Sequence, residues 1–462
     1  MHLGSIKFNS IISLLKKSFF YIKSSLDKNE TSKNGLDILF FSRDRVIDIK
    51  TEAGEIRSDY LFGGIIHNIK KKHSDYKIAL LSTTFKSMPK IDDIRSYSLI
   101  QYRTPLILTK SAVFSMVIYL RWKLSRSKTI NYLRDNDCEY VVSLLDNFFS
   151  VKTIIYYLIF DYCLQNVLKK MKPKVIMAND DVLNFKPRTN LENTKVIIMQ
   201  SALINKMNER YRGLFFSFFP LNGMINDYFL VSCPKFEDMK KCTNDFKELL
   251  LIGQPRYDIL ADADKIYNKN EILERMDLDP TKKVIIWTTQ THGLPLDENE
   301  KNISAVYNAI KSLENAQLVI KLHPAEDQNA PLYKKHKSFN PVIVDGKADT
   351  YALLYACDLM ITRHSTTAME AVALNKPVIV LNLSGEPDPV EYVKEGVALG
   401  VYKEEDLKSA IKRLLKDDSE LAKNRAKYIE KYLYRIDGGA TERVVNLIEK
   451  MIEESKKGKN EK

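Results

Sequence analysis

Cysteine is scarce in this sequence, and its placement argues against a structural zinc site. The chain of 462 residues contains five cysteines, which are scattered singly and never form a Cys-x-x-Cys pair: Cys138, Cys163, Cys233, Cys242 and Cys357. A zinc site needs thiolates or imidazoles at close, regular spacing. We therefore expect reduced thiols in a cytoplasmic protein and no structural zinc.

The sequence also lacks the marks of secretion and of a membrane span. Residues 1–35 carry no small-residue cleavage site after their apolar positions, so a signal peptide is not expected. They form a basic amphipathic segment, which can lie on an anionic membrane or pack on its own domain. The apolar stretch Leu106–Leu120 is short for a membrane span and contains Lys110. It predicts a helix buried in the core.

Recognisable nucleic-acid-binding motifs are missing, although the formal net charge is +12. There is no RNA-binding motif and no basic helix with interleaved aromatic residues. The positive charge is therefore interpreted as favouring an anionic membrane surface or an anionic substrate rather than nucleic acid.

What the chain does contain is two series of strands that alternate with helices. The first series runs from strand Leu36–Phe41 to strand Asp227–Val231, and the second from Lys282–Trp287 to Val397–Val401. This alternation predicts α/β domains built on parallel sheets with right-handed crossovers. A chain of this length is too long for one ordinary core, so two domains are expected.

Further segments carry expectations of their own. Pro105–Arg134 predicts two helices, Tyr140–Leu145 predicts a strand, and Glu248–Ile252 predicts a strand in the junction after the first series. From Glu404 onward the spacing of apolar residues predicts helices.

The stretch Asp358–Asn382 contains the clearest candidate site. A buried strand ending at Thr362 is followed by a polar turn, by a helix with Glu370 in its first turn, and by a second strand. The turn consists of Arg363, His364, Ser365, Thr366 and Thr367. In a doubly wound sheet such a turn lies at the ligand crevice, and the amides and hydroxyls at a helix start suit a phosphate group. Ser365 or Thr366 is expected to cap the helix.

Another strand end supplies further donors. The strand Gln317–Leu322 delivers Lys321, which provides a point charge, and His323, which provides a directed donor, while Pro324 fixes the turn. Gln290 follows strand Lys282–Trp287 and is expected to border the same crevice.

Short motifs in the second half of the chain resemble those of one enzyme group. His323-Pro324 and Ser365-Thr366 are similar to its donor motifs, 253–258 to its Gly-x-Pro-Arg-x-Asp junction, and 437–443 to its Asp-Gly-x-Ala…Arg motif. The group comprises CDP-glycerol glycerophosphotransferases, capsular Kdo-transferases and sialyltransferase-like enzymes of surface polysaccharide synthesis. The resemblance spans roughly residues 174–449.

The tandem domains and this resemblance imply a GT-B fold. Two Rossmann-like doubly wound domains would face each other across a cleft, and the C-terminal helix would cross back to the N-terminal domain. The expected segments are a basic N-terminal segment, an acceptor domain, a junction, a donor domain, and a C-terminal helix with a charged tail: residues 1–35, 36–234, 235–280, 281–430 and 431–462.

The resemblance also implies an activity and its partners. The expected enzyme moves a sugar or alditol phosphate from a CDP-, CMP- or UDP-linked donor to a cell-surface glycan or lipid-linked acceptor. No cofactor is expected, and no metal, because no Asp-x-Asp motif lies at a strand end. The expected location is cytoplasmic, peripheral on the inner face of the plasma membrane. The predicted donor residues are Gly253, Arg256, Gln290, Lys321, His323, Pro324, Arg363, His364, Ser365, Thr366, Thr367 and Glu370.

The sequence departs from the group at one position. Many relatives carry Gln-His-Gly where this chain has Gln200-Ser201-Ala202. Asp180 and Asp181 are therefore the predicted catalytic carboxylates, with His323 acting on the donor. The predicted acceptor-side residues are Arg43, Asp44, Gln200 and Ser201. A non-hydrolysing UDP-sugar 2-epimerase and an inactive relative that only binds a nucleotide or glycan remain alternatives.

Overall fold

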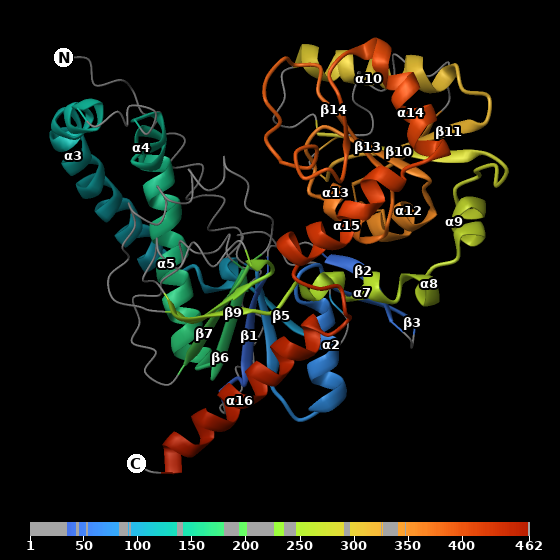
Figure 1. Cartoon of the computed structure of the whole chain (residues 1–462). Helices are drawn as coiled ribbons and strands as arrows, with labels where there is room; N and C mark the ends of the chain where they lie inside the picture. Colours follow the sequence, from blue (N-terminus) through green and yellow to red (C-terminus); the bar gives the residue numbers. More distant parts are fainter. Residues whose placement is uncertain are drawn as a thin grey trace. The chain divides into compact units, whose positions relative to one another are not determined.

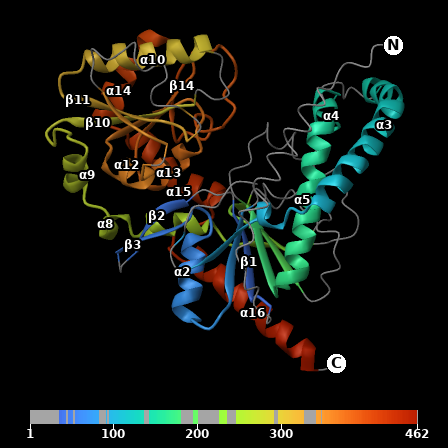
Figure 2. The same ribbon diagram turned by 180° about the vertical axis from the view of Figure 1, so that it is seen from behind.

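A computed structural model of the chain describes most of the sequence. The described residues are 35–42, 46–51, 54–82, 91, 94–135, 142–179, 194–200, 226–234, 246–290, 296–324, 326, 341–346 and 348–460. Their contacts divide the chain into two compact units, each described by itself below (Figures 1 and 2).

The two units interleave along the sequence. The first unit consists of Met1–Asp44, Tyr76–Ile176 and Phe185–Thr194. The second unit consists of Arg45–Asp75, Met177–Asn184 and Lys195–Lys462. The domain boundaries expected from the sequence stay a prediction.

One sheet has seven strands in the order β5-β4-β1-β6-β7-β8-β9. Its strands are β1 (Ile38–Ser42), β4 (Ile78–Ser82), β5 (Arg95–Ser98), β6 (Val175–Asn179), β7 (Lys195–Met199), β8 (Asn226–Val231) and β9 (Phe246–Leu251). All five residues of β1, β4 and β6 are buried, as expected for parallel strands covered on both faces. Strand β9, which the sequence placed in the junction, is an edge strand of this sheet.

In the first unit, strand β5 is followed by the helices α3 (Pro105–Asp135), α4 (Val142–Phe148) and α5 (Val151–Met171), whereas strands β7, β8 and β9 belong to the second unit. The prediction of two helices in Pro105–Arg134 is wrong, because α3 is continuous. The prediction of a strand at Tyr140–Leu145 is also wrong, since α4 covers the described part of that stretch. A short apolar run fits either type of element. The helical state of α4 places Asp146 and Phe149 against α3, where Arg126 and Trp122 meet them.

The outer face of α3 corrects another expectation. The stretch Leu106–Leu120 was expected to be core, but Leu106, Val113 and Phe114 are exposed. The opposite side of α3 packs on α5, so the helix has apolar residues on both sides and only one of them is covered. No helix in the described part of the chain is long and apolar enough to cross a membrane.

The second sheet has six strands in the order β12-β11-β10-β13-β14-β15. They are β10 (Lys283–Thr288), β11 (Ala316–Lys321), β12 (Val342–Val344), β13 (Leu359–Thr362), β14 (Val378–Leu381) and β15 (Leu399–Val401). Every adjacent pair in this sheet is parallel.

Each face of this sheet has its own apolar core. Successive side chains of β10 point to opposite faces of the sheet. Ile285 packs in the core formed with α10 (Leu296–Lys311) and α14 (Leu407–Lys416). Ile286 packs in the core formed with α12 (Thr350–Ala356) and α13 (Thr367–Ala373). Figures 1 and 2 show the two pairs of helices on opposite sides of the sheet.

The C-terminal helix α16 (Ala440–Asn460) returns to a segment from the N-terminal half of the sequence. It packs against α2 (Gly63–Lys72) within the second unit. Nε2 of His73 lies 2.7 Å from Oε1 of Glu449, and Nζ of Lys72 lies 3.2 Å from Oε1 of Glu442. The predicted return of the last helix is therefore confirmed.

The second unit has further elements outside the two parallel sheets. They are the hairpin β2–β3 (Val46–Thr51 and Gly54–Asp59), which the sequence analysis missed, the short helices α7 (Asp258–Ala261) and α8 (Ala263–Ile266), and the helices α9 (Lys269–Arg275) and α15 (Ser419–Tyr432).

Candidate functional site

Three neighbouring strands of the six-stranded sheet end together at its topological switch point. From β10 the chain builds outward to β11 and β12 on one side, and then to β13, β14 and β15 on the other. Thr288 at the end of β10 is in register with Lys321 of β11 and with Thr362 of β13. Ligands of doubly wound sheets bind outside the carboxyl ends of the strands at this point.

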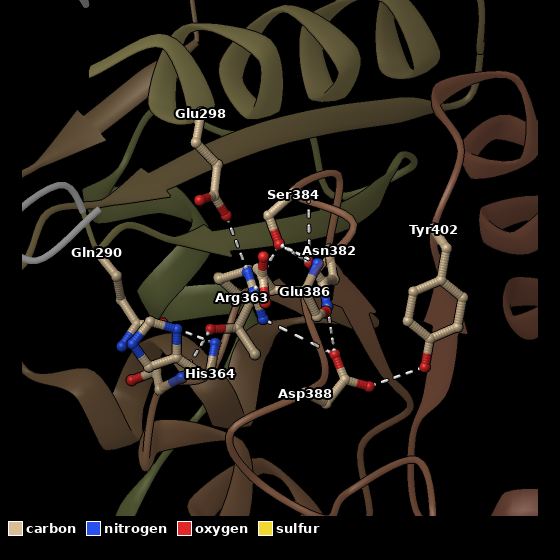
Figure 3. Close-up of polar contacts among 11 residues, drawn as sticks. Gln290, Glu298, Arg363, His364, Asn382, Ser384, Glu386, Asp388 and Tyr402 are labelled. Atoms are coloured by element: carbon tan, nitrogen blue, oxygen red, sulfur yellow. Dashed lines mark hydrogen bonds and ion pairs between the residues drawn. The ribbon is translucent and has the colours of Figure 1, made fainter. Parts of the chain in front are cut away.

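Hydrogen bonds join the loops that follow these strands. The backbone amide of His364 donates to Oε1 of Gln290 over 2.7 Å (Figure 3). The amide of His323 donates to Oγ1 of Thr289 over 3.0 Å, and Thr289 donates to Glu326 over 2.6 Å. The structure thus brings three predicted donor residues, Gln290, His323 and His364, to one edge of the sheet.

Ser365 organises the start of α13. Its Oγ accepts from the amide of Thr367 over 3.2 Å, and its carbonyl accepts from the hydroxyl of Tyr392 over 2.9 Å. Ser365 is the capping residue, and Thr366 makes no side-chain cap. Because α13 has only seven residues, the predicted phosphate site at its start would depend on the side chains of this loop more than on the helix dipole.

Arg363 is held by two carboxylates that the sequence analysis missed. Its Nε donates to Oε1 of Glu298 over 3.0 Å, and its Nη1 lies 3.7 Å from Oδ1 of Asp388 (Figure 3). Nη2 donates to Ser384 over 3.2 Å. Asp388 also accepts from Tyr402, and burial together with this bond raises the pKa of Tyr402 to about 12. The guanidinium is therefore fixed in place, and its charge is offset by neighbours.

Lys321 and Pro324 also have local partners. The buried ammonium of Lys321 donates to the carbonyl of Leu322 over 3.0 Å. Gly346 lies directly against Pro324, where a Cβ would come within 2.3 Å of Cα of the proline. Only glycine fits at this position, so the backbone at Gly346 packs closely against the turn that carries His323 and Pro324.

Arg256 and Glu370, both predicted donor residues, meet in a buried cluster. Nη2 of Arg256 lies 3.6 Å from Glu370 and donates to the hydroxyl of Tyr257 over 2.8 Å, and Nη1 donates to the hydroxyl of Tyr60. Burial opposes the charge of Arg256, yet Tyr257, Tyr60 and Tyr351 with Glu370 raise the guanidinium pKa well above its ordinary value. Glu370 thus faces an arginine and tyrosines inside the fold, a setting that its prediction as a donor residue did not anticipate.

The junction motif and the C-terminal motif bind each other. Asp258 accepts from the amides of Ala440 and Thr441 over 3.0 and 2.7 Å and so caps α16. Arg443 donates to the carbonyl of Ile252 over 2.9 Å. Gly253 has a φ of +80°, and a Cβ there would lie 3.4 Å from Arg443. These residues fasten the last helix to the junction.

The predicted acceptor-side residues are only partly described. Gln200 is buried, and its Oε1 accepts from the amide and hydroxyl of Ser232, each over 2.8 Å. The other predicted residues on this side lie outside the described residues: Arg43, Asp44, Asp180, Asp181 and Ser201. No metal-like group of three or more His, Cys, Asp or Glu side chains occurs among the residues that the structure describes.

Comparison with known proteins identifies the family. The profile of the CDP-glycerol:poly(glycerophosphate) glycerophosphotransferase family matches residues 208–450, more than half of the chain. The chain belongs to this family. No curated protein matches the chain.

Solved structures agree on the fold. The wall teichoic acid polymerase TagF is 14% identical with a TM-score of 0.53, over 97% of this chain and 99% of that one. UDP-GlcNAc 2-epimerase from Neisseria meningitidis, bound to UDP-GlcNAc, is 14% identical with a TM-score of 0.52, over 90% and 100%. At these identities the similarity establishes the GT-B-like fold alone.

The family match confirms the predicted class of activity. The protein is a transferase that uses a nucleotide-activated donor in the synthesis of a cell-surface polymer. The epimerase alternative is supported by the shared fold only.

Proposed function

We propose that this protein transfers glycerol phosphate from CDP-glycerol to the growing end of a poly(glycerol phosphate) chain. The observation that carries the proposal is the convergence of Gln290, His323 and His364 at the switch point, inside the segment that matches the family. That edge offers imidazoles, hydroxyls and the side-chain amide of Gln290 to a diphosphate.

The reaction follows from the donor's chemistry. A terminal hydroxyl of the acceptor attacks the phosphorus that carries glycerol, the bond to the bridging oxygen breaks, and CMP leaves. The hydroxyl loses one proton, which Asp180 or Asp181 accepts as general base. His323 and the hydroxyls around Ser365 balance the charge that develops on the leaving phosphate, while Arg363, paired with Glu298 and Asp388, holds the loop in place.

The proposed setting is the cytoplasmic face of the plasma membrane. The charge of +12 and the basic amphipathic segment of residues 1–35 support attachment to anionic lipid. Removal of residues 1–30 should reduce vesicle binding, and more strongly at low salt.

A donor panel tests the activity. CDP-glycerol should release CMP and lengthen an oligo(glycerol phosphate) acceptor, whereas CMP-, UDP- and GDP-linked compounds should not. Turnover should persist with chelator. Epimerisation of UDP-GlcNAc without transfer would favour the epimerase alternative. Binding of CDP-glycerol without CMP release would favour the inactive relative with Ser201.

A further inference from the structure

The loop between β13 and α13 carries the hydroxyls of the predicted phosphate site. Its residues 364–367 are partly exposed, so the rest of the protein must hold their backbone in place. The amide of Ser365 donates to Oγ1 of Thr362 over 3.3 Å, and the amide of His364 donates to Gln290. These bonds fix two amides of the loop near the carboxyl ends of β13 and β10. The carbonyl of Ser365 accepts a further bond from a different part of the chain.

The segment after β14, residues 382–392, contacts this loop at two points. Oδ1 of Asp388 lies 3.7 Å from Nη1 of Arg363 (Figure 3), and the hydroxyl of Tyr392 donates to the carbonyl of Ser365 over 2.9 Å. The two contacts are four residues apart in the segment and two residues apart in the loop. The segment therefore fixes the orientation of the loop as well as its position.

The 382–392 segment is itself well fixed. Pro387 and Pro389 flank Asp388, and a proline fixes its own φ and restricts the residue before it. Nδ2 of Asn382 donates to Oδ1 of Asp388 over 2.8 Å, and the hydroxyl of Tyr402 donates to Oδ2 over 2.7 Å (Figure 3). Asp388 thus has little freedom to move, and the segment can serve as a rigid support.

Tyr392 is 1% exposed and begins a column of three tyrosine rings. Its ring centroid lies 6.2 Å from that of Tyr428, which stacks on Tyr432 at 4.5 Å within α15. Burial, with Tyr257 and Glu370 nearby, raises the pKa of the Tyr392 phenol well above its ordinary value. The phenol therefore stays protonated around neutral pH and remains a donor to the loop carbonyl.

We propose that Tyr392 is a positioning residue for the diphosphate of the donor. Its hydroxyl holds the carbonyl of Ser365 and thereby sets where the hydroxyls of residues 365–367 lie relative to the phosphates. Tyr392 is buried, so it acts through Ser365 and does not touch the donor. Binding groups must be held close to their productive geometry by such supporting bonds. The proposal rests on the proposed use of CDP-glycerol and adds a residue outside the two donor motifs.

Tyr432 provides a matched comparison for a tyrosine that only stabilises the fold. It lies in the same column, is 4% exposed, and its hydroxyl donates to Oε1 of Glu395 over 2.7 Å. Tyr392→Phe and Tyr432→Phe each remove one phenol hydroxyl from a buried ring and keep the stacked column. A difference between the two variants therefore reports where the lost hydrogen bond ended.

The test measures ligand binding by calorimetric titration and loop opening by amide hydrogen exchange. Tyr392→Phe should weaken CDP-glycerol binding about fivefold to tenfold, the range expected for one lost hydrogen bond, and leave the binding of cytidine, which has no phosphate, unchanged. Without ligand, peptides that cover residues 364–370 should exchange about threefold faster or more. Tyr432→Phe should match the wild type in all three measurements. The two variants should show similar, small decreases in melting temperature.

Two further variants separate positioning from general stabilisation. In a Ser365→Ala background, Tyr392→Phe should weaken CDP-glycerol binding by a further factor of about two or less, because the positioned hydroxyl of Ser365 is already absent. Pro389→Ala keeps the phenol but frees the backbone between Asp388 and Tyr392. It should weaken CDP-glycerol binding about twofold to threefold and leave cytidine binding unchanged.

Three results would overturn the inference. They are wild-type CDP-glycerol affinity in Tyr392→Phe, equal losses in Tyr392→Phe and Tyr432→Phe, and losses that multiply in full with Ser365→Ala. If the wild-type protein does not bind CDP-glycerol, the proposed function fails, and the hydrogen exchange of the loop decides the inference by itself. Equal exchange of residues 364–370 in Tyr392→Phe and the wild type would then reject it.

Discussion

Two pairs of motifs mark this chain as a family member, yet they occupy different settings within the second unit. The His-Pro and Ser-Thr motifs at 323–324 and 365–366 follow strands β11 and β13, which flank β10 at the switch point of the six-stranded sheet. The junction and C-terminal motifs at 253–258 and 437–443 bind each other through a helix cap and an arginine–carbonyl bond.

This difference in setting indicates that the two pairs of motifs serve different roles, one in binding a ligand and the other in stabilising the fold. Side chains at a switch point have backbone geometry that presents them to a ligand. Side chains that cap a helix already have hydrogen-bond partners within the protein, and their loss mainly lowers the free energy of unfolding. We therefore expect variants of the first pair to lose binding or turnover and variants of the second pair to lose stability.

The largest expected effect lies at a strand end of the seven-stranded sheet. Asp180 follows β6 directly in the sequence and is the predicted general base. Asp180→Asn should lower turnover about 10²–10⁴-fold, the usual loss for a missing base. The melting temperature should not change. Asp75→Asn, at an exposed position, is the control. Near-normal turnover in both Asp180→Asn and Asp181→Asn would reject the assignment and direct attention to Ser201.

The next effect concerns the first motif pair. His323→Ala and Ser365→Ala should each weaken CDP-glycerol binding by about 1–3 kcal/mol, the cost of losing a polar partner in a ligand site. Calorimetric titration measures this, and His67→Ala on α2 serves as a histidine control. Unchanged affinity in both variants would show that CDP-glycerol does not bind at the switch point, and the proposed difference between the two motif pairs would be rejected.

A smaller effect is expected for the second pair. Asp258→Ala removes the acceptor for two amides at the start of α16, and loss of such a cap costs about 0.5–2 kcal/mol of unfolding free energy. The affinity of the folded protein for CDP-glycerol should be unchanged. Asp262→Ala nearby, whose ion pair with Lys265 is exposed, should change little. A loss of affinity at wild-type stability would give the junction motif a direct role at the donor.

Strand ends were predictable from the sequence, and side-chain partners were not. The apolar runs at 283–288 and 359–362 place Gln290 and His364 at one edge, because the strands of a parallel sheet point the same way. No local pattern connects Arg363 with Glu298, 65 residues earlier, or with Asp388. Such partners depend on how the loops cross the sheet.

The errors in the fold prediction have a similar cause. Apolar content indicated burial for Leu106–Leu120, but content alone does not say which side of a helix a neighbour covers. The helix α4 was predicted as a strand because a short apolar run fits both periods. The hairpin β2–β3 was missed because its sequence, VIDIKT and GEIRSD, is largely polar.

The smallest expected effect tests how the C-terminal motif holds its arginine. The Arg443 guanidinium donates to both carboxylate oxygens of Asp437 at 3.0 and 3.1 Å, and this bond lowers the pKa of Asp437 below its usual 3.8. A carboxylate with a lowered pKa in the folded state stabilises the fold above its unfolded pKa, and this stabilisation disappears as the pH falls through the folded pKa. Asp437→Asn should therefore cost less than about 1 kcal/mol at pH 7, since both partners are partly exposed, and almost nothing near pH 2. Urea unfolding across this pH range measures the difference, and the same substitution in an Arg443→Gln background should remove its pH dependence. If Asp437→Asn lowers the free energy of unfolding equally at all pH values in both backgrounds, Asp437 acts through its bond to the Gly439 amide. The ion pair with Arg443 would then have no part in stabilising this motif.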